Sequence, residues 1–362
     1  MITAGRPVLI TGGAGFIGAN LADRLLRDGH QVVIFDNLSR PGAQRNLRWL
    51  RHQHGDRASV ICGDVRDGVA VEQAVARASQ VYHLAAQAGV SGSLTDPITD
   101  FDINARGTVN VLEGLRRQPE PPPLLHASTS KVYGPLDGIP LRDAGDRYEP
   151  RDPVLAAAGI AESHPLDFHT PYGCSKGAAD QYVIDYARTW GLPAVVFRLS
   201  CIYGPHQFGN ERQGWIAHFI LRALDGQPIE IRGEGKELRD VLFVDDLVDA
   251  MVLAQERIGV TAGRAFNIGG GPEHTLSARE LLQLIEELGV APRAEFSEAT
   301  GPAQRYYVSD TSLFGTLTGW RPRTGVRAGV EQLYRWVRES GALLAEGRRP
   351  AFLALAGSDA RG

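Results

Sequence analysis

The sequence predicts an α/β fold in which a doubly wound parallel sheet is joined by a smaller, discontinuous α/β lobe towards the C-terminus. Short apolar runs alternate with helical patterns along the chain, which is the rhythm of such a sheet. The first apolar run leads directly into a glycine-rich turn and a helical pattern, and the second run ends in a carboxylate. This order is typical of a dinucleotide-binding unit.

A strand is expected at residues 6–10 and a helix at 19–26, with Thr11-Gly12-Gly13-Ala14-Gly15-Phe16-Ile17-Gly18 between them. Glycines are needed there because the turn is tight and the backbone must approach a pyrophosphate, which the N–H groups of the helix N-terminus then bind. The segment therefore predicts a Rossmann cofactor site. Its contacts are expected at Gly12, Gly15, Phe16, Ile17 and Gly18.

The second strand, residues 31–35, ends at Asp36, where a carboxylate can hold the ribose hydroxyls of the cofactor. The same charge would repel a 2′-phosphate, so Asp36 favours NAD over NADP. Asn37, Ser39 and Arg40 follow and are assigned to the same site. Arg40 has two interpretations, because it could pair with a 2′-phosphate or cover the adenine ring.

Two further strands are expected at residues 58–62 and 80–84, with Cys62 in the core of the first. Asp64 follows the first of them, where it could accept a hydrogen bond from the adenine amino group or cap the next helix. Ligands bind at the carboxyl ends of parallel strands. We therefore assign these neighbours to the cofactor as well: Val65, Leu84, Ala85, Ala86 and Gln87.

A helix over residues 98–117 and a strand over 124–127 come next. Asn104 lies in the middle of that helix, where asparagine is a poor helix former, so we expect it to make buried hydrogen bonds in the cofactor site. The strand delivers Thr129 to the same sheet edge. Its hydroxyl could bond a substrate hydroxyl, although turn chemistry is the alternative.

Tyr172 and Lys176 stand four residues apart, which places both side chains on one face of a helix. A neighbouring cation lowers the pKa of a phenol and favours the phenolate, so the pair could act as one acid/base unit. By itself such a pair is common on solvated helix faces. With a cofactor site upstream, it predicts proton transfer coupled to hydride transfer.

Composition agrees with an enzyme of the cytoplasm. The 362 residues are 43% hydrophobic with a net charge of −4, which indicates no nucleic-acid surface, and no apolar run reaches the length of a membrane span. We also expect no signal peptide, because the first strand begins so early. The three cysteines are too scattered for a disulfide framework, and no metal-binding motif occurs.

These motifs, with Ser128-Thr129 and Arg198-x-x-x-Ile202-Tyr203-Gly204-Pro205, together resemble the extended short-chain dehydrogenase/reductase family and its nucleotide-sugar enzymes. The resemblance implies bound NAD, contacted also by Ser128, Ile202, Tyr172 and Lys176, and a catalytic triad of Thr129, Tyr172 and Lys176. It implies an NAD-binding domain at residues 1–206 with 240–272. Residues 207–239 and 273–362 would then bind the sugar nucleotide.

The resemblance also implies substrate contacts. Arg239 and Arg305 match arginines that bind the diphosphate in related epimerases, and guanidinium groups suit phosphate geometry. Phe208 could stack on the nucleotide base. The other substrate residues are assigned as Thr129, Ser130, Lys131, His169, Cys201 and Gln207. Helices near 98–117 and 172–188 commonly pair between subunits in this family, so a homodimer or homotetramer is expected.

The reaction can be narrowed by chemistry. The family's dehydratases carry an Asp-Glu pair after the catalytic threonine, and its decarboxylases usually carry a glutamate in that segment, whereas this chain has Ser130 and Lys131. Residues 166–182 resemble the branch that epimerises CDP-hexoses of the paratose and tyvelose type. We therefore expect inversion at C2 through a 2-keto sugar. A 4-epimerase of an NDP-hexose or UDP-uronate, a net reductase and a non-catalytic NAD-binding protein remain alternatives.

Overall fold

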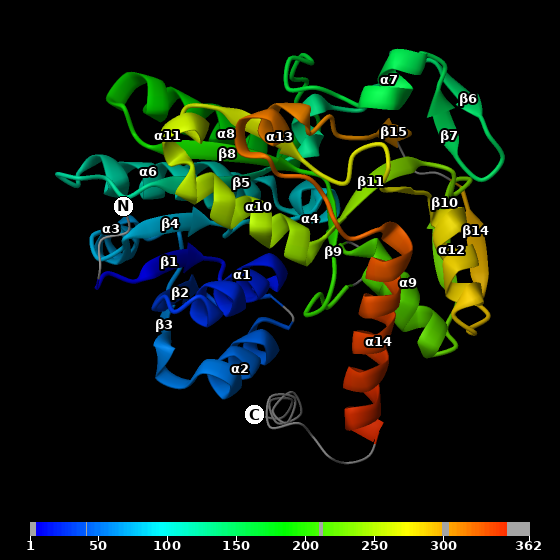
Figure 1. Ribbon diagram of the computed structural model, residues 1–362, viewed down its shortest axis with the longest axis horizontal. Coiled ribbons are helices and arrows are strands. Elements are labelled where there is room, and N and C mark those ends of the chain that lie inside the picture. Colours follow the sequence, from blue (N-terminus) through cyan, green and yellow to red (C-terminus); the bar gives the residue numbers. More distant parts are fainter. Residues whose placement is uncertain (1–4, 41, 210–212, 299–303, 346–362) are drawn as a thin grey trace.

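The computed structural model describes residues 5–40, 42–209, 213–298 and 304–345, and its centre is a seven-stranded parallel sheet (Figure 1). The strand order β12-β8-β5-β4-β1-β2-β3 confirms the predicted doubly wound fold. The strands are β1 (Val8–Thr11), β2 (Val32–Asp36), β3 (Ala58–Cys62), β4 (Gln80–His83), β5 (Leu124–Thr129), β8 (Ala194–Leu199) and β12 (Ala265–Ile268).

Helices cover both faces of this sheet because successive strand residues point to opposite sides. Ile10 of β1 lies in the core beneath one helical layer, whereas Leu9 belongs to the core beneath the other. The first layer holds α1 (Phe16–Arg27), α2 (Ala43–His54) and α10 (Val244–Glu256). The second holds α3 (Gly68–Val75), α6 (Gly107–Arg116) and α8 (Thr170–Trp190), which lie behind the sheet in Figure 1.

The helix expected at 98–117 forms in three parts: α5 (Pro97–Phe101), a π-helical turn (Asp102–Arg106) and α6. Asn104 is buried in the π-helical turn, as its poor helix propensity suggested. The prediction that Cys62 lies in the core is wrong, because its thiol is exposed. It is the last residue of β3, which forms the edge of the sheet and is covered less than the central strands.

Smaller sheets and a third helical layer complete the chain. Strands β9 (Cys201–Tyr203), β11 (Leu238–Phe243), β13 (Thr275–Leu276) and β15 (Tyr306–Tyr307) form one sheet, and β10 (Ile229–Arg232) pairs with β14 (Ala294–Ser297). Helices α9 (Trp215–Leu224), α12 (Ala278–Glu287) and α14 (Val326–Ala345) pack around them on the right in Figure 1. Residues Cys201–Tyr203 of β9 pair with Val241–Phe243 of β11, and Leu238 and Arg239 of β11 pair with β15, so the lobe boundary predicted after residue 239 falls inside a strand.

An insertion after β5 forms the hairpin β6 (Leu141–Asp143) and β7 (Tyr148–Pro150), followed by α7 (Pro153–Ala158). Lys236 Nζ lies 2.7 Å from Asp143 Oδ2 and ties the hairpin to the segment before β11. Short helices α4 (Val90–Thr95), α11 (Ile258–Thr261) and α13 (Ser312–Thr318) fill the remaining connections, with 3-10 turns at Gly55–Arg57 and Ser130–Tyr133. Within the described ranges, no helix is long and apolar enough to cross a membrane.

Candidate active site

A cleft of about 470 Å³ opens at the carboxyl ends of β1, β2 and β4. This is the edge of an open parallel sheet at which ligands bind. The cleft brings together most of the residues predicted to bind the cofactor: Gly12, Gly15, Phe16, Ile17, Gly18, Asp36, Asn37, Ser39, Arg40, Asp64, Val65, Leu84, Ala85, Ala86 and Gln87.

The glycine turn brings backbone unusually close to backbone. Gly12 has φ +70°, and a Cβ atom there would lie 2.6 Å from the amide nitrogen of Ala85. A Cβ atom on Gly18 would lie 2.4 Å from the carbonyl oxygen of Gly12. Gly15 caps α1 without a side-chain hydrogen bond, so the first N–H groups of the helix are left for a ligand. This cradle fits the diphosphate of a dinucleotide.

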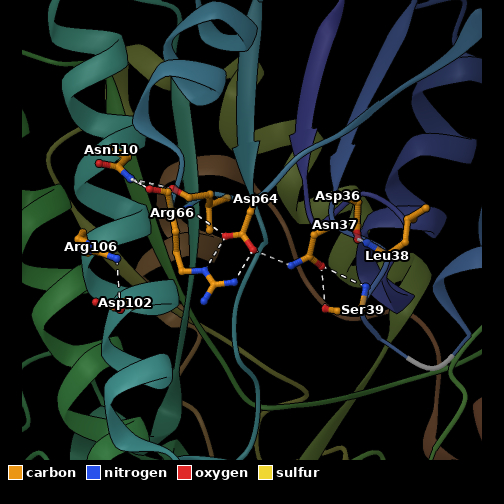
Figure 2. Close-up of polar contacts among 10 residues, drawn as sticks. Asp36, Asn37, Leu38, Ser39, Asp64, Arg66, Asp102, Arg106 and Asn110 are labelled. Atoms are coloured by element: carbon orange, nitrogen blue, oxygen red, sulfur yellow. Dashed lines mark hydrogen bonds and ion pairs between the residues drawn. The ribbon is translucent and has the colours of Figure 1, made fainter.

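Asp36, at the end of β2, is held in place by the backbone (Figure 2). Its Oδ1 accepts a hydrogen bond from the Leu38 N–H at 2.8 Å, and its Oδ2 accepts one from the Ala14 N–H at 3.0 Å. Burial raises the pKa of this carboxyl, and the two backbone hydrogen bonds oppose the shift. Each oxygen keeps a further lone pair, so the carboxylate can still accept bonds from ribose hydroxyls.

Asp64 is paired within the protein (Figure 2). The Arg66 guanidinium, 2.8 Å away, lowers the pKa of the Asp64 carboxyl, and Asn37 Nδ2 donates to it at 2.9 Å. The alternative in which Asp64 caps the next helix is wrong, because Asp67 accepts the N–H bonds that begin α3. Asp64 instead lies in the cleft wall, where the carboxylate is already ionised.

Arg40 bridges two segments at the cleft. It donates to Gln213 Oε1 at 2.5 Å and to the carbonyl oxygen of Ala88 at 3.0 Å. Burial lowers the pKa of its guanidinium, and interactions with Tyr172 and Asp36 oppose that shift. Arg40 is therefore a cation close enough to Tyr172 to influence its ionisation.

The proposed triad surrounds the start of α8, where Pro171 occupies the first turn. The Tyr172 phenol lies close enough to the Thr129 hydroxyl, at the end of β5, for their interaction to lower the pKa of the phenol. Lys176 Nζ donates to the carbonyl oxygen of Ala127 at 2.6 Å, and burial lowers its pKa to about 8. The structure thus brings both hydroxyls and the ammonium group to one sheet edge.

The direction of the Tyr172 pKa differs from the expected one. Burial raises the pKa of the phenol, and the negative charge of Asp100 adds to the rise. The hydrogen bond from Thr129 and the charge of Arg40 oppose it. Sequence spacing pointed to Lys176 as the cation that lowers this pKa, whereas here Arg40 exerts that influence. The phenol is accordingly held in its neutral form before ligands bind.

Asn104 lies behind the cleft wall and hydrogen-bonds to the backbone of Gln87 in that wall. Its Oδ1 accepts the Gln87 N–H at 2.9 Å, and its Nδ2 donates to the Gln87 carbonyl oxygen at 3.1 Å. The same Nδ2 lies 3.0 Å from Ser175 Oγ, in the helix that carries Tyr172. The predicted buried hydrogen-bonding role is therefore confirmed, and it links the cofactor cleft to α8.

A second cluster of polar groups lies around Lys131, in the turn after β5. Lys131 Nζ donates to Gln304 Oε1 at 2.8 Å, and Arg239 donates to the Gln304 carbonyl oxygen. Burial lowers the pKa of Lys131 to about 7, with a further lowering by the charge of Arg239 and an opposite effect of Cys201. These two cations are bridged by the uncharged Gln304, which sequence reasoning missed.

The remaining predicted residues have diverse surroundings. Arg305 lies over the Tyr148 ring at 4.1 Å from its centroid, and His169 pairs with Asp167 at an exposed position. Ser128 is buried, and its hydroxyl has no hydrogen-bond partner among the described residues. Other placements are Ser130 in the buried 3-10 turn, Ile202 in β9, and Gln207 and Phe208 in the wall of the cofactor cleft.

Several cleft residues carried no recognisable sequence signal, because they belong to no motif and come from segments far from the glycine turn. They include Ala43, Asn46, Ala88, Ser91, Ile103, His206 and Gln213. Within the described part of the chain, no group of three or more His, Cys, Asp or Glu side chains could hold a metal ion.

Comparison with known proteins agrees with this geometry. Residues 8–269 match the NAD dependent epimerase/dehydratase family. The chain is 38% identical over 337 residues to CDP-paratose 2-epimerase of Salmonella typhi, covering 91% of this chain and 98% of that enzyme. It is 33% identical over 343 residues to dTDP-glucose 4,6-dehydratase of Actinoplanes sp., covering 91% and 97%.

A solved structure of UDP-glucuronic acid 4-epimerase from Bacillus cereus, in complex with UDP-glucuronic acid and NAD, superposes with a TM-score of 0.78. The two chains are 26% identical, and the match covers 92% of this chain and 99% of that one. The glycine cradle, the oriented Asp36 carboxylate and the hydroxyl pair at the sheet edge fit NAD. The chain therefore belongs to the NAD dependent epimerase/dehydratase family, which acts on nucleotide sugars, and its cofactor is NAD.

Proposed function

We propose that this enzyme inverts C2 of a CDP-hexose by transient oxidation to a 2-keto sugar. The observation that carries the proposal is the proximity of the Thr129 and Tyr172 hydroxyls at the carboxyl edge of the sheet, with Ser130 and Lys131 following Thr129 in place of two carboxylates. Elimination of water requires an added acid and base, whereas epimerisation requires only reversible oxidation. The likeness to the Salmonella typhi 2-epimerase supports C2 and the cytidine nucleotide.

In this mechanism each residue of the site has a separate role. Tyr172, which must first lose its own proton to become the phenolate, takes the proton of the C2 hydroxyl and later returns it, and Thr129 holds the same oxygen. Bound NAD supplies a reversible hydride acceptor. Lys176 places a positive charge beside the reacting groups, and Arg40 favours the phenolate. The keto sugar must then present its other face before reduction, which inverts the stereocentre with no net redox change.

A 4-epimerase of an NDP-hexose or UDP-uronate is the second candidate. The overall likeness to the Bacillus cereus UDP-glucuronic acid 4-epimerase favours it, because the same triad would serve either carbon. The two candidates differ only in which sugar carbon lies against the nicotinamide. In both cases Arg239 of β11 and Arg305, which directly precedes β15, would bind the diphosphate, because guanidinium groups match phosphate geometry.

The experiment that separates them uses CDP-, UDP-, GDP- and dTDP-hexoses without added cofactor, with products identified by NMR. We expect a C2 epimer from a CDP-hexose and no accumulation of NADH. A substrate deuterated at C2 should react more slowly and keep its label in the product, whereas deuterium at C4 should have no effect on rate. Inversion at C4, or a rate effect from the C4 label, would contradict the C2 assignment.

The proposal also covers the division of the chain into domains, the oligomeric state and the cellular location. Residues 1–206 and 240–272 would bind NAD, and residues 207–239 and 273–362 would bind the sugar nucleotide. The enzyme would work as a homodimer or homotetramer in the cytoplasm, where exposed thiols such as Cys174 stay reduced. Ile98 and Phe101 of α5 are 71% and 53% exposed, which suits a subunit interface. Light scattering of Ile98→Asp should show monomers if this helix forms the interface.

A further inference from the structure

Residues 205–208 leave β9 and run over the cofactor cleft. His206, Gln207 and Phe208 line this cleft together with Gly12 and Asp36. The sequence predicts that Gln207 and Phe208 contact the sugar nucleotide. In the structure, however, both residues lie in the wall of the NAD cleft.

Two asparagines fasten this segment to the helices that flank the glycine turn. Asn20 Nδ2 of α1 donates to the carbonyl oxygen of Pro205 at 3.0 Å. Asn46 Nδ2 of α2 donates to the carbonyl oxygen of His206 at 3.3 Å and to that of Ala14 at 3.2 Å. The segment is therefore attached to both elements that form the phosphate and ribose ends of the site.

Aromatic contacts of His206 and Phe208 hold the same segment against α2 and α14. The His206 ring stacks on Trp49 of α2, with 3.7 Å between centroids, and contacts Trp336 of α14 at 5.3 Å. The Phe208 ring lies under the Arg45 guanidinium, 5.3 Å from its centroid. A Cβ atom on Gly42 would lie 2.1 Å from Phe208 Cδ2, so the ring rests directly against the backbone before α2.

Two buried acceptors in this wall lack partners. Asn46 is 2% exposed and Gln207 9% exposed, and neither Asn46 Oδ1 nor Gln207 Oε1 has a hydrogen-bond partner among the described residues. Their amide nitrogens are engaged, Gln207 Nε2 with the Ile202 carbonyl oxygen at 3.1 Å, so the oxygens are the unused ends. A buried acceptor without a donor destabilises the protein, and a ligand hydroxyl would relieve that cost.

We propose that residues 205–208 are a clasp of the NAD site, in which Asn46 and Gln207 accept hydrogen bonds from ribose hydroxyls of the cofactor and Phe208 closes the side next to Gly42. The neighbouring Asp36 and Ala43 place the clasp on the adenosine half of the site. NAD is therefore kept through many turnovers. Retention is useful because the proposed epimerase reaction regenerates NAD, but the binding itself depends only on the cofactor.

The first test measures NAD retention without any sugar. Wild type, Phe208→Ala and Asn20→Ala are purified, loaded with NAD, desalted and chased with excess ethenoadenine dinucleotide, whose fluorescence reports exchange. We expect wild type to keep NAD through desalting and each variant to release it about tenfold faster, the effect of about 1.4 kcal/mol. Asn20 does not line the cleft, so its effect would arise from the clasp alone.

Phe296→Ala is the matched control, because Phe296 also lies under an arginine, Arg279 at 5.1 Å, but in β14 far from the cleft lining. It should release NAD at the wild-type rate. Thermal unfolding of each variant shows whether it is folded when NAD is lost. Wild-type retention in both Phe208→Ala and Asn20→Ala, or rapid loss of NAD from the wild type, would refute the clasp.

The second test examines the unpaired acceptors. Gln207→Met keeps the side-chain volume but removes the acceptor, and its affinity is measured for NAD and for NAD lacking the adenosine ribose hydroxyls. If Gln207 accepts from a ribose hydroxyl, the loss caused by the missing hydroxyls should be smaller in the variant than in the wild type. Equal losses in both proteins would remove Gln207 from the proposal. Neither test depends on which sugar or carbon the enzyme uses.

Discussion

Asn104 holds both the N–H and the carbonyl group of Gln87, across 17 residues of chain. The contact joins a π-helical turn to the cleft wall after β4, and the same amide reaches Ser175 beside the proposed base. An asparagine amide suits this position because it offers one acceptor and two donors in a single plane. The cofactor wall and the catalytic helix thus share one buried anchor.

Asn104→Ala should destabilise the protein and weaken NAD binding together. The change leaves the Gln87 N–H and carbonyl without partners in a buried site, which costs about 2 to 4 kcal/mol. Urea unfolding and NAD titration measure the two effects. Gln118→Ala is the control, since among the described residues its side-chain amide donates only to the carbonyl of Gly114, in the last turn of the preceding helix α6. If NAD affinity is unchanged while stability falls, Asn104 does not shape the cofactor site.

Tyr172→Phe should stop turnover and leave NAD in place. Removing the phenolic hydroxyl removes the acid/base group, and such groups contribute roughly 10²- to 10⁴-fold to rate. The kcat for epimerisation and the NAD content after desalting are the two measurements. Tyr182→Phe, an exposed tyrosine of the same helix, should behave as wild type. Substantial activity in Tyr172→Phe would exclude this phenol as the base.

The central sheet could be predicted because fully buried parallel strands leave uninterrupted apolar runs. The strand at Ala58–Cys62 has the bounds that the sequence indicated. The glycine turn and Asp36 were recognisable because pyrophosphate and ribose impose residue types at given spacings. Cys62 was misplaced for a related reason: an apolar run does not reveal which strand forms the edge of the sheet.

Other parts of the site could not be predicted, because they consist of residues that are far apart in the sequence and meet only in the folded structure. Asn46 and His206 meet across 160 residues, and Gln304 reaches Lys131 across 173. Asn46, His206 and Gln304 belong to no spaced motif, whereas Lys131 was recognisable in the segment that follows Thr129. The direction of the Tyr172 pKa shift could not be predicted from the sequence either. It depends on burial and on the charge of Arg40, and both are set by the folded structure.

Gly12→Ala should abolish NAD binding and destabilise the fold. Its φ of +70° disfavours a side chain, and the added Cβ atom would meet the Ala85 backbone at 2.6 Å. Gly29→Ala is the control, because Gly29 has φ +92° but open space around it, so only about 1 kcal/mol of conformational strain is expected. Isothermal titration with NAD distinguishes them. Equal effects of the two changes would show that the close approach is unimportant.

The buried pair of Asp180 and Arg198 should be intolerant of single changes. Arg198 Nε and Nη2 donate to the two carboxylate oxygens of Asp180 at 3.0 and 2.9 Å, joining α8 to β8. Asp180→Asn leaves the guanidinium charge uncompensated and should cost about 3 to 5 kcal/mol in the free energy of unfolding. Adding Arg198→Met removes that charge and should restore part of the loss. A double variant less stable than Asp180→Asn would contradict this explanation.

Lys131 should make substrate binding depend on pH. Its pKa of about 7 in the free enzyme means that the ammonium form declines above that pH, whereas a bound diphosphate favours the ammonium. Binding of a CDP-hexose should therefore take up a proton and weaken by up to about tenfold per pH unit above that pKa. Calorimetry in buffers of different ionisation enthalpy measures the uptake directly.

Two substitutions separate charge from titration at this position. Lys131→Arg stays protonated throughout, so binding should remain strong at alkaline pH and the slope should vanish. Lys131→Met also has no slope, but its binding should be weak at every pH because the charge is missing. If Lys131→Arg keeps the wild-type pH dependence, another group titrates. The contrast therefore tests whether the pH dependence comes from the Lys131 ammonium, which donates to Gln304.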